Sequence, residues 1–198
     1  MKTITIAHQK GGVGKSTIAL NLSYALLNKG YKVAVKDMDT QGTTFACAQS
    51  IKVFSPEENM IHKKDYDFLI IDTPPYLSAG NLNLFIQSDL VIVPTKPSIA
   101  DVLAIERTIV LFEQAQYKNR EVKGRILFNM VDSRTNMLTN IEEEVKKFNI
   151  PVMKTKIESR VSYTRTLLED KGIFSENAPL AHQEINNLAE EVIKIINN

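Results

Sequence analysis

Residues 8–17 read HQKGGVGKST, and this stretch decides how the rest of the chain is interpreted. It follows a short β-branched run over Thr3–Ala7 and precedes an apolar helical pattern that begins near Lys15. A glycine-rich turn between a strand and a helix is the context of a phosphate-binding P-loop, G-x-x-x-x-G-K-[ST]. The match is incomplete, because Gln9 stands where the first glycine of that pattern belongs and a second lysine, Lys10, follows it.

The residue types of this loop suit the phosphates of a nucleotide. Its glycines allow the backbone to turn sharply and to direct N–H groups at phosphate oxygens, and the following helix adds a positive dipole end. Lys15 is placed to reach the β- and γ-phosphates, Ser16 to ligate Mg²⁺, and Thr17 to bind a further phosphate oxygen. The expected nucleotide-binding residues of the loop are Gly11, Gly12, Val13, Gly14, Lys15, Ser16 and Thr17.

Length and composition predict one globular domain over residues 1–198. The chain has 43% hydrophobic and 24% charged residues, which is ordinary for a soluble protein with a sizeable core. Its apolar runs are too short to span a membrane, and its N-terminus becomes polar too early for a signal peptide. The single cysteine, Cys47, excludes an intrachain disulfide. We therefore expect a cytoplasmic protein.

Short apolar runs alternate with helical patterns along the chain. Continuous apolar runs are typical of strands buried on both faces, and their alternation with helices predicts an α/β fold. We expect a mostly parallel twisted sheet with helices on both faces, and a loop over Gln49–Lys64. The expected strands are Thr3–Ala7, Lys32–Lys36, Phe68–Ile71, Leu90–Val93 and Arg125–Met130; the clearest helical faces run through Ile18–Leu26, Ile141–Phe148 and Ile185–Ile196.

Acidic residues follow two of these strands, at the edge where ligands of parallel sheets bind. Asp37 and Asp39 would point the same way if their strand continued, and could then hold a metal-bound water and align an attacking water. A turn or helix cap is the alternative for this pair. Asp72 ends a hydrophobic strand, which is the Walker B arrangement for reaching Mg²⁺.

An amide follows the last expected strand. Asn129 has both a donor and an acceptor, so it could contact the edge of the nucleotide base. The alternative is a loop amide that bonds its own backbone.

With these residues in place, the chain resembles the ParA/MinD family of deviant Walker ATPases, and most of all the short, ParF-like ParA proteins of plasmid partition. KGGVGKST at 10–17, D-x-D-x-Q-G at 37–42, YDFLIIDTPP at 66–75 and SDLVIVPTKPS at 88–98 occur in family order. The resemblance implies a P-loop NTPase fold, ATP and Mg²⁺ as cofactors, and weak intrinsic ATP hydrolysis.

The resemblance also implies roles for individual residues. Lys10 matches the family's signature lysine, which reaches the ATP of the partner subunit in an ATP-sandwich homodimer. Asp39 matches the residue that positions the hydrolytic water, and Asp37 its neighbour near the metal. The implied catalytic residues are Lys10, Lys15 and Asp39, Lys10 also contacts nucleotide, and the implied metal ligands are Ser16, Asp37 and Asp72.

The implied partners are non-specific DNA, bound by the ATP dimer at the nucleoid, and a ParB-type protein that stimulates hydrolysis. The net charge of +1 does not by itself indicate a DNA partner. Residues 146–171, however, hold seven basic and three acidic residues, so this stretch is a candidate DNA surface. A solvated helical face is the alternative. His8 and Thr40 depart from the family pattern, and we expect His8 to be only a tolerated neighbour of the loop.

Other functions fit the sequence less well. A dethiobiotin- or cobyrinate-synthase-like ligase would need a site for an organic acceptor. A MinD-like membrane switch would need a basic amphipathic helix at the C-terminus, where residues 188–198 carry Glu190 and Glu191 against Lys194. A nitrogenase-iron-protein-like reductase would need cluster cysteines. The sequence leaves the cargo open among a plasmid, a chromosome origin, conjugation machinery and a protein cluster, with a preference for plasmid DNA.

Overall fold

The structure is a computed structural model that describes residues 1–39, 48–58, 61–76, 79–132, 137–166 and 169–198. Expectations that involve Thr40, Gln41, Gly42 and Cys47 lie outside the described residues. No helix in the described ranges is long and apolar enough to cross a membrane.

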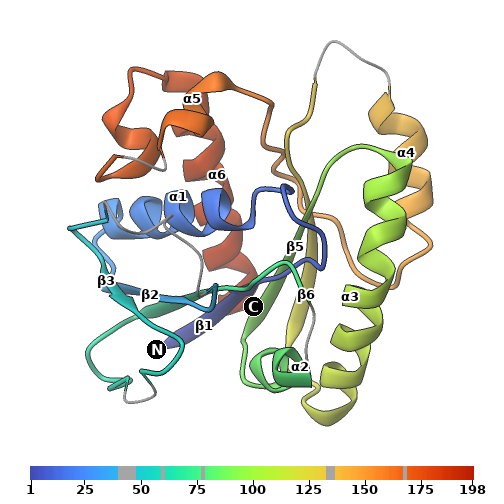
Figure 1. Ribbon diagram of the computed structural model, residues 1–198, viewed down its shortest axis with the longest axis horizontal. Coiled ribbons are helices and arrows are strands. Elements are labelled where there is room, and N and C mark those ends of the chain that lie inside the picture. Colours follow the sequence, from blue (N-terminus) through green and yellow to red (C-terminus); the bar gives the residue numbers. More distant parts are fainter. Residues whose placement is uncertain (40–47, 59–60, 77–78, 133–136, 167–168) are drawn as a thin grey trace.

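Six parallel strands form one sheet in the order β3-β2-β4-β1-β5-β6 (Figure 1). Parallel pairing places all six carboxyl ends at one edge, and β1 and β4 lie in the middle of the sheet. The strands are β1 (Lys2–Ile6), β2 (Val33–Asp37), β3 (Lys52–Phe54), β4 (Phe68–Asp72), β5 (Leu90–Thr95) and β6 (Lys123–Phe128).

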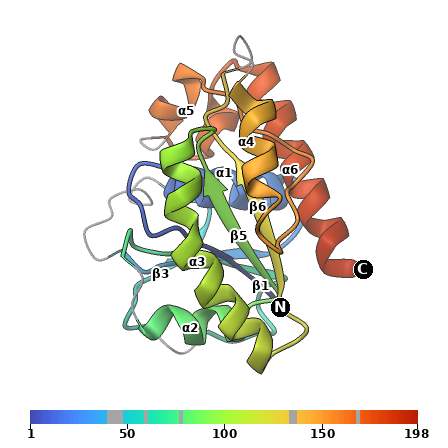
Figure 2. The same ribbon diagram turned by 90° about the vertical axis from the view of Figure 1, so that its right-hand side faces the viewer.

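Helices cover both faces of the sheet. Helices α1 and α6 lie on one face, and α2, α3 and α4 lie on the other (Figures 1 and 2). The described helices are α1 (Lys15–Asn28), α2 (Ala79–Ile86), α3 (Ile99–Lys118), α4 (Met137–Val145), α5 (Val161–Arg165), the 3-10 helix η2 (Gly172–Ser175) and α6 (Pro179–Asn197).

Strand β5 shows how one sheet serves two cores. Leu90 and Ile92 belong to the cluster under α1 and α6, whereas Val91 and Val93 belong to the cluster under α3. Successive side chains of a strand point to opposite faces, so a continuous apolar run fills both layers. The expected α/β fold with a parallel sheet and helices on both faces is confirmed.

The five expected strands agree with observed strands to within two residues at each end. The expectation of a loop over Gln49–Lys64 was wrong in one part, because Lys52–Phe54 forms the edge strand β3 beside β2. A strand of three residues gives no alternating pattern long enough to recognise in a sequence. The long helix α3 was also absent from the helical faces that the sequence made clearest.

Candidate nucleotide-binding site

The P-loop joins the end of β1 to the start of α1, as the sequence predicts. Gly12 and Gly14 have φ angles of 72° and 90°, a region in which a residue with a side chain is strained. Gly14 caps α1, and its carbonyl accepts a hydrogen bond of 2.9 Å from the N–H of Ile18. A Cβ atom on Gly14 would lie 2.2 Å from Nδ2 of Asn129, so this position has no room for a side chain.

The N-terminus of α1 is available to an anion. The N-cap residue, Gly14, has no side chain that could accept from the first N–H groups of the helix, and these groups have no partner within the helix. A Cβ atom on Gly12 would meet nothing within 4 Å, so the loop is open at this point. The N–H groups of a helix start, a helix dipole and an open loop together suit a phosphate group.

Lys15 lies inside the loop and not at its surface. The residue is 7% exposed, and its Nζ donates a hydrogen bond of 3.3 Å to the carbonyl of Lys10. Burial lowers the pKa of Lys15, while the charges of Asp72 and Asp39 oppose this shift. The ammonium group thus lies between the loop backbone and the carboxylates, which is where a bound phosphate would meet it.

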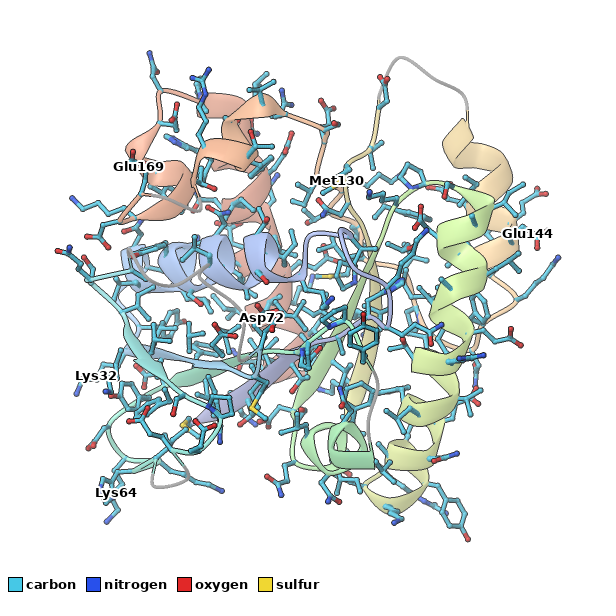
Figure 3. All side chains as sticks on the ribbon, viewed as in Figure 1. Lys32, Lys64, Asp72, Met130, Glu144 and Glu169 are labelled. Carbon is cyan, nitrogen blue, oxygen red and sulfur yellow. The ribbon has the colours of Figure 1, made fainter. Side chains whose placement is uncertain are left out.

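Asp37 and Asp72 end adjacent strands at the carboxyl edge, and they are partners in the register of β2 and β4. Asp72 is 1% exposed and lies just below α1 in the view of Figure 3. Burial, with a smaller contribution from the charge of Asp37, raises the pKa of Asp72 to about 7, against a hydrogen bond from Ser16. Within the described ranges no group hydrogen-bonds Oδ1 of Asp72.

These residues fit Mg²⁺. The described residues contain no cluster of three or more His, Cys, Asp or Glu side chains that would form an all-protein metal site. Mg²⁺ instead favours one or two carboxylates together with a hydroxyl, water and the phosphates of a substrate. The orphaned oxygen of Asp72, beside Ser16 and Asp37, provides such a partial set of ligands.

Asp39 joins the site by the turn that the sequence left as the alternative to a continued strand. Strand β2 ends at Asp37, and the N–H of Asp39 donates a hydrogen bond of 2.9 Å to Oδ1 of Asp37. The two carboxylates therefore belong to a turn, not to one extended strand. Asp39 still lies close enough to Lys15 and Asp72 to affect their pKa values. Its role in orienting water stays a prediction.

Asn129 contacts the loop itself. Its Nδ2 donates a hydrogen bond of 2.8 Å to the carbonyl of Val13, and the residue is 3% exposed. Met130, labelled in Figure 3, follows in a left-handed conformation with φ of 55°. The amide thus braces the P-loop from the end of β6, and its contact with a base stays a prediction.

Lys10 points away from its own P-loop toward α3. Its Nζ lies 2.5 Å from Oδ1 of Asp101, and the two side chains are 46% and 9% exposed. Ser98, the N-cap of α3, donates a hydrogen bond to Oδ2 of Asp101. Burial acts to raise the pKa of Asp101, but the hydrogen bonds from Lys10 and Ser98 outweigh it and hold that pKa below its usual value.

The sequence interpretation missed the role of His8. The side chain is fully buried, and its Nδ1 accepts a hydrogen bond of 2.8 Å from the N–H of Lys10. Burial, followed by the positive charge of Lys15, lowers the pKa of His8 to about 4, so the ring is neutral near pH 7. His8 therefore positions the backbone from which the second lysine extends.

The basic stretch 146–171 is partly neutralised by carboxylates. Lys147 pairs with Glu144, Lys156 pairs with Glu142, and Arg160 lies 2.6 Å from Glu184. Arg160 also pairs with Glu158. Among the described residues, at least three of the seven basic residues in this candidate DNA surface are therefore engaged in ion pairs.

Fold and site define a P-loop nucleotide-binding protein, and comparison with known proteins names its family. Residues 4–173 match the CobQ/CobB/MinD/ParA nucleotide binding domain. The chain therefore belongs to this family, and its resemblance to ParA/MinD proteins is confirmed.

Relatives by sequence cover nearly the whole chain. The Maintenance of carboxysome distribution protein A of Halothiobacillus neapolitanus is 30% identical, with 96% of each chain covered. The Sporulation initiation inhibitor protein Soj of Bacillus subtilis is 27% identical, over 96% of this chain and 98% of Soj.

Solved structures share the fold. Apo McdA of Cyanthece has a TM-score of 0.77 at 17% identity, over 97% of this chain and 99% of McdA. A putative plasmid partition protein of Borrelia burgdorferi bound to AMPPNP has a TM-score of 0.71 at 23% identity, with 98% of each chain covered.

Proposed function

We propose that this chain is an ATP-driven partitioning switch. It binds Mg-ATP, forms an ATP-sandwich dimer that holds DNA non-specifically, and releases DNA after hydrolysis that a ParB-type partner stimulates. The observation that carries the proposal is the divergence of two lysines from one loop. Lys15 is buried inside the loop, whereas Lys10 is half exposed and extends away from it.

The buried half of the site acts on the chain's own nucleotide. Lys15 and the uncapped N–H groups of α1 bind phosphate oxygens. Ser16, Asp37 and Asp72 would hold Mg²⁺, which would neutralise phosphate charge. Asp39, at the turn after β2, orients the attacking water.

The exposed lysine acts on the nucleotide of a second copy. Two ATP-loaded faces repel each other, and a cation from each chain placed on the other's phosphates offsets this repulsion. The same cation stabilises negative charge during phosphoryl transfer, as an arginine finger does. Dimerisation then depends on ATP, because Lys10 binds Asp101 of its own chain when no phosphates of a partner are present.

The relatives support a role in positioning a cargo inside the cell, and their names leave two classes of cargo open for this chain. Their names refer to carboxysome distribution and to chromosome partitioning, so the cargo is either DNA or a protein body. Cobyrinic acid a,c-diamide synthase of Mycobacterium smegmatis has a TM-score of 0.75 at 18% identity, which shows a shared fold alone. The second lysine, together with the carboxysome-distribution and chromosome-partitioning relatives, favours the switch over a ligase.

The test compares variants of the two lysines by light scattering and nucleotide titration. Lys15→Ala is expected to lose ATP binding, whereas Lys10→Ala is expected to bind ATP and remain monomeric. Wild-type protein with ADP is the control for a nucleotide-bound monomer. A Lys10→Ala dimer that forms with ATP as the wild type does would refute the proposal.

A further inference from the structure

A cationic cleft lies far from the nucleotide site. It encloses about 780 Å³ and is lined by Lys123 and Arg125 of β6, by Lys154 and Thr155, and by Asn187 and Lys194 of α6. Lys123 begins β6, at the edge of the sheet opposite the carboxyl ends. Figure 2 shows the end of α6 at the right and the blue P-loop at the left.

The cleft forms because only part of strand β6 is covered along its outer side. Residues after α4 pair with Ile126, which donates to the carbonyl of Pro151 at 3.0 Å and accepts from the N–H of Met153 at 2.8 Å. No such backbone pairing covers Lys123–Arg125 among the described residues. A gap therefore remains between the start of β6 and the last turns of α6.

The acidic residues of the cleft are already engaged. Glu191 accepts hydrogen bonds of 2.7 and 2.8 Å from the N–H groups of Lys154 and Thr155, which fixes this segment against α6. Glu190 pairs with Lys29 at 2.8 Å. Neither carboxylate forms an ion pair with a basic residue of the cleft in the described part of the chain.

The basic residues of the cleft keep donors available. Lys123 Nζ donates to the carbonyl of Ile195 at 2.8 Å, in the last turn of α6, and so uses one of its three N–H groups. Burial lowers the pKa of Arg125 although Glu191 opposes this, so the guanidinium is partly desolvated, and the part of the chain that the structure describes forms no ion pair with it. Lys154 and Lys194 are exposed, and the described residues place no carboxylate within ion-pair distance of them.

We propose that this cleft binds phosphate groups of the DNA backbone, an inference that rests on the proposed function. Its lining offers ammonium, guanidinium, hydroxyl and amide donors, and lysine and arginine contacts to phosphates need no base sequence. The exposed Lys154 and Lys194 extend the site outward to a long polyanion. DNA binding is therefore assigned to the edge of β6 and not to Lys147, Lys156 and Arg160, whose charges are paired with carboxylates.

The experiment compares two charge-reversal pairs with equal change in net charge. Lys154→Glu with Lys194→Glu alters the cleft, and Lys146→Glu with Arg165→Glu alters exposed residues outside it. Binding to a random-sequence duplex is measured by fluorescence anisotropy over a salt series, with a non-hydrolysable ATP analogue. The cleft pair is expected to lose at least about ten-fold in affinity and about two units of log–log salt slope, while the control pair changes far less.

The other outcomes have separate meanings. DNA binding that both pairs weaken equally, or that neither weakens, overturns the cleft assignment and leaves the proposed function intact. Wild-type protein that binds no DNA in any nucleotide state overturns the proposed function, and the inference falls with it. Cleft variants that lose pyrophosphate binding but keep DNA binding also overturn the cleft assignment, because the cleft then binds a free phosphate ligand and not DNA. The double variant Lys154→Gln with Lys194→Gln removes the same two positive charges without adding carboxylates. An unchanged ATP affinity in this variant shows that a loss of DNA binding is not caused by a folding defect.

Discussion

The ammonium group of Lys10 lies 2.5 Å from the carboxylate of Asp101 in the same chain. Asp101 is in turn fixed by Ser98 at the start of α3, so the lysine proposed to act in trans is held by a rigid element in cis. Any role of Lys10 in a second subunit requires this ion pair to be exchanged for phosphate contacts. In the proposed dimer, the pair would therefore oppose dimerisation until ATP is bound.

Replacement of Asp101 by asparagine tests that opposition. Asp101→Asn removes the charge but keeps the shape, and should lower the ATP concentration at half-maximal dimerisation by roughly two- to five-fold, since a half-exposed ion pair contributes up to about 1 kcal/mol. Light scattering across an ATP titration measures this half-maximal ATP concentration. Glu144→Gln, which removes the exposed pair with Lys147, is the matched control. A midpoint that rises in Asp101→Asn contradicts the account.

Substitutions at Gly14 and Asn129 should have non-additive effects on the free energy of unfolding. Gly14→Ala places a Cβ atom 2.2 Å from Nδ2 of Asn129 at φ of 90°, whereas Gly30→Ala meets nothing within 4 Å at φ of 89°. Gly30→Ala thus reports backbone strain alone, about 1 kcal/mol. Gly14→Ala should cost about 1–3 kcal/mol more in urea unfolding. Adding Asn129→Ala should recover part of that difference; no recovery would show that the two side chains do not compete for space.

Asp39 is expected to affect hydrolysis and not binding. Asp39→Ala should keep its ATP affinity and its ATP-dependent dimer, because Lys15 and Lys10 remain. Its turnover should fall by about 100-fold if the carboxylate orients the attacking water. Phosphate release under single-turnover conditions measures this, with Asp39→Asn as the conservative variant. Turnover at the wild-type rate would remove Asp39 from the mechanism.

His8 makes stability depend on pH. Its pKa is lowered from 6.5 to about 4 in the folded chain, so the unfolded chain binds the additional proton and stability falls as pH drops through this window. Between pH 7 and 5 the loss should be about 2 kcal/mol. His8→Asn keeps an acceptor for the N–H of Lys10 and removes the titration. Identical pH dependence of unfolding in both proteins would show that His8 does not cause it.

The sequence predicted the sheet and the P-loop because both have strong local patterns. Buried parallel strands are continuous apolar runs, and the glycine–lysine loop has a fixed place between β1 and α1. Strand β3 was missed because three edge residues have no such pattern. The sequence left the geometry of Asp39 open between a continued strand and a turn, because periodicity does not show the hydrogen bond that the N–H of Asp39 donates to the carboxylate of Asp37.

Long-range contacts account for the rest. Asp101 is 91 residues from Lys10 and Asn129 is 116 from Val13, so only the folded sheet brings these pairs together. The cationic cleft combines the start of β6 with the end of α6 in the same way. The count of charges along the sequence favoured residues 146–171 as the DNA surface. Such a count omits carboxylates that other elements place nearby in the fold, such as Glu184 beside Arg160.

Mixing two inactive variants shows whether Lys10 acts on the ATP of its own chain or on that of a partner. Lys10→Ala lacks the lysine and Asp39→Ala lacks the carboxylate, so each alone should hydrolyse ATP poorly. If Lys10 acts on the partner's ATP, a mixed dimer contains one complete site, formed by Asp39 of the first chain and Lys10 of the second. Equal mixing should then raise turnover well above that of either variant alone, up to about a quarter of wild-type turnover per chain, since a mixed dimer keeps only one of its two cross-subunit lysines. Turnover of the mixture that equals the mean of the two separate variants would contradict a lysine that acts across the dimer.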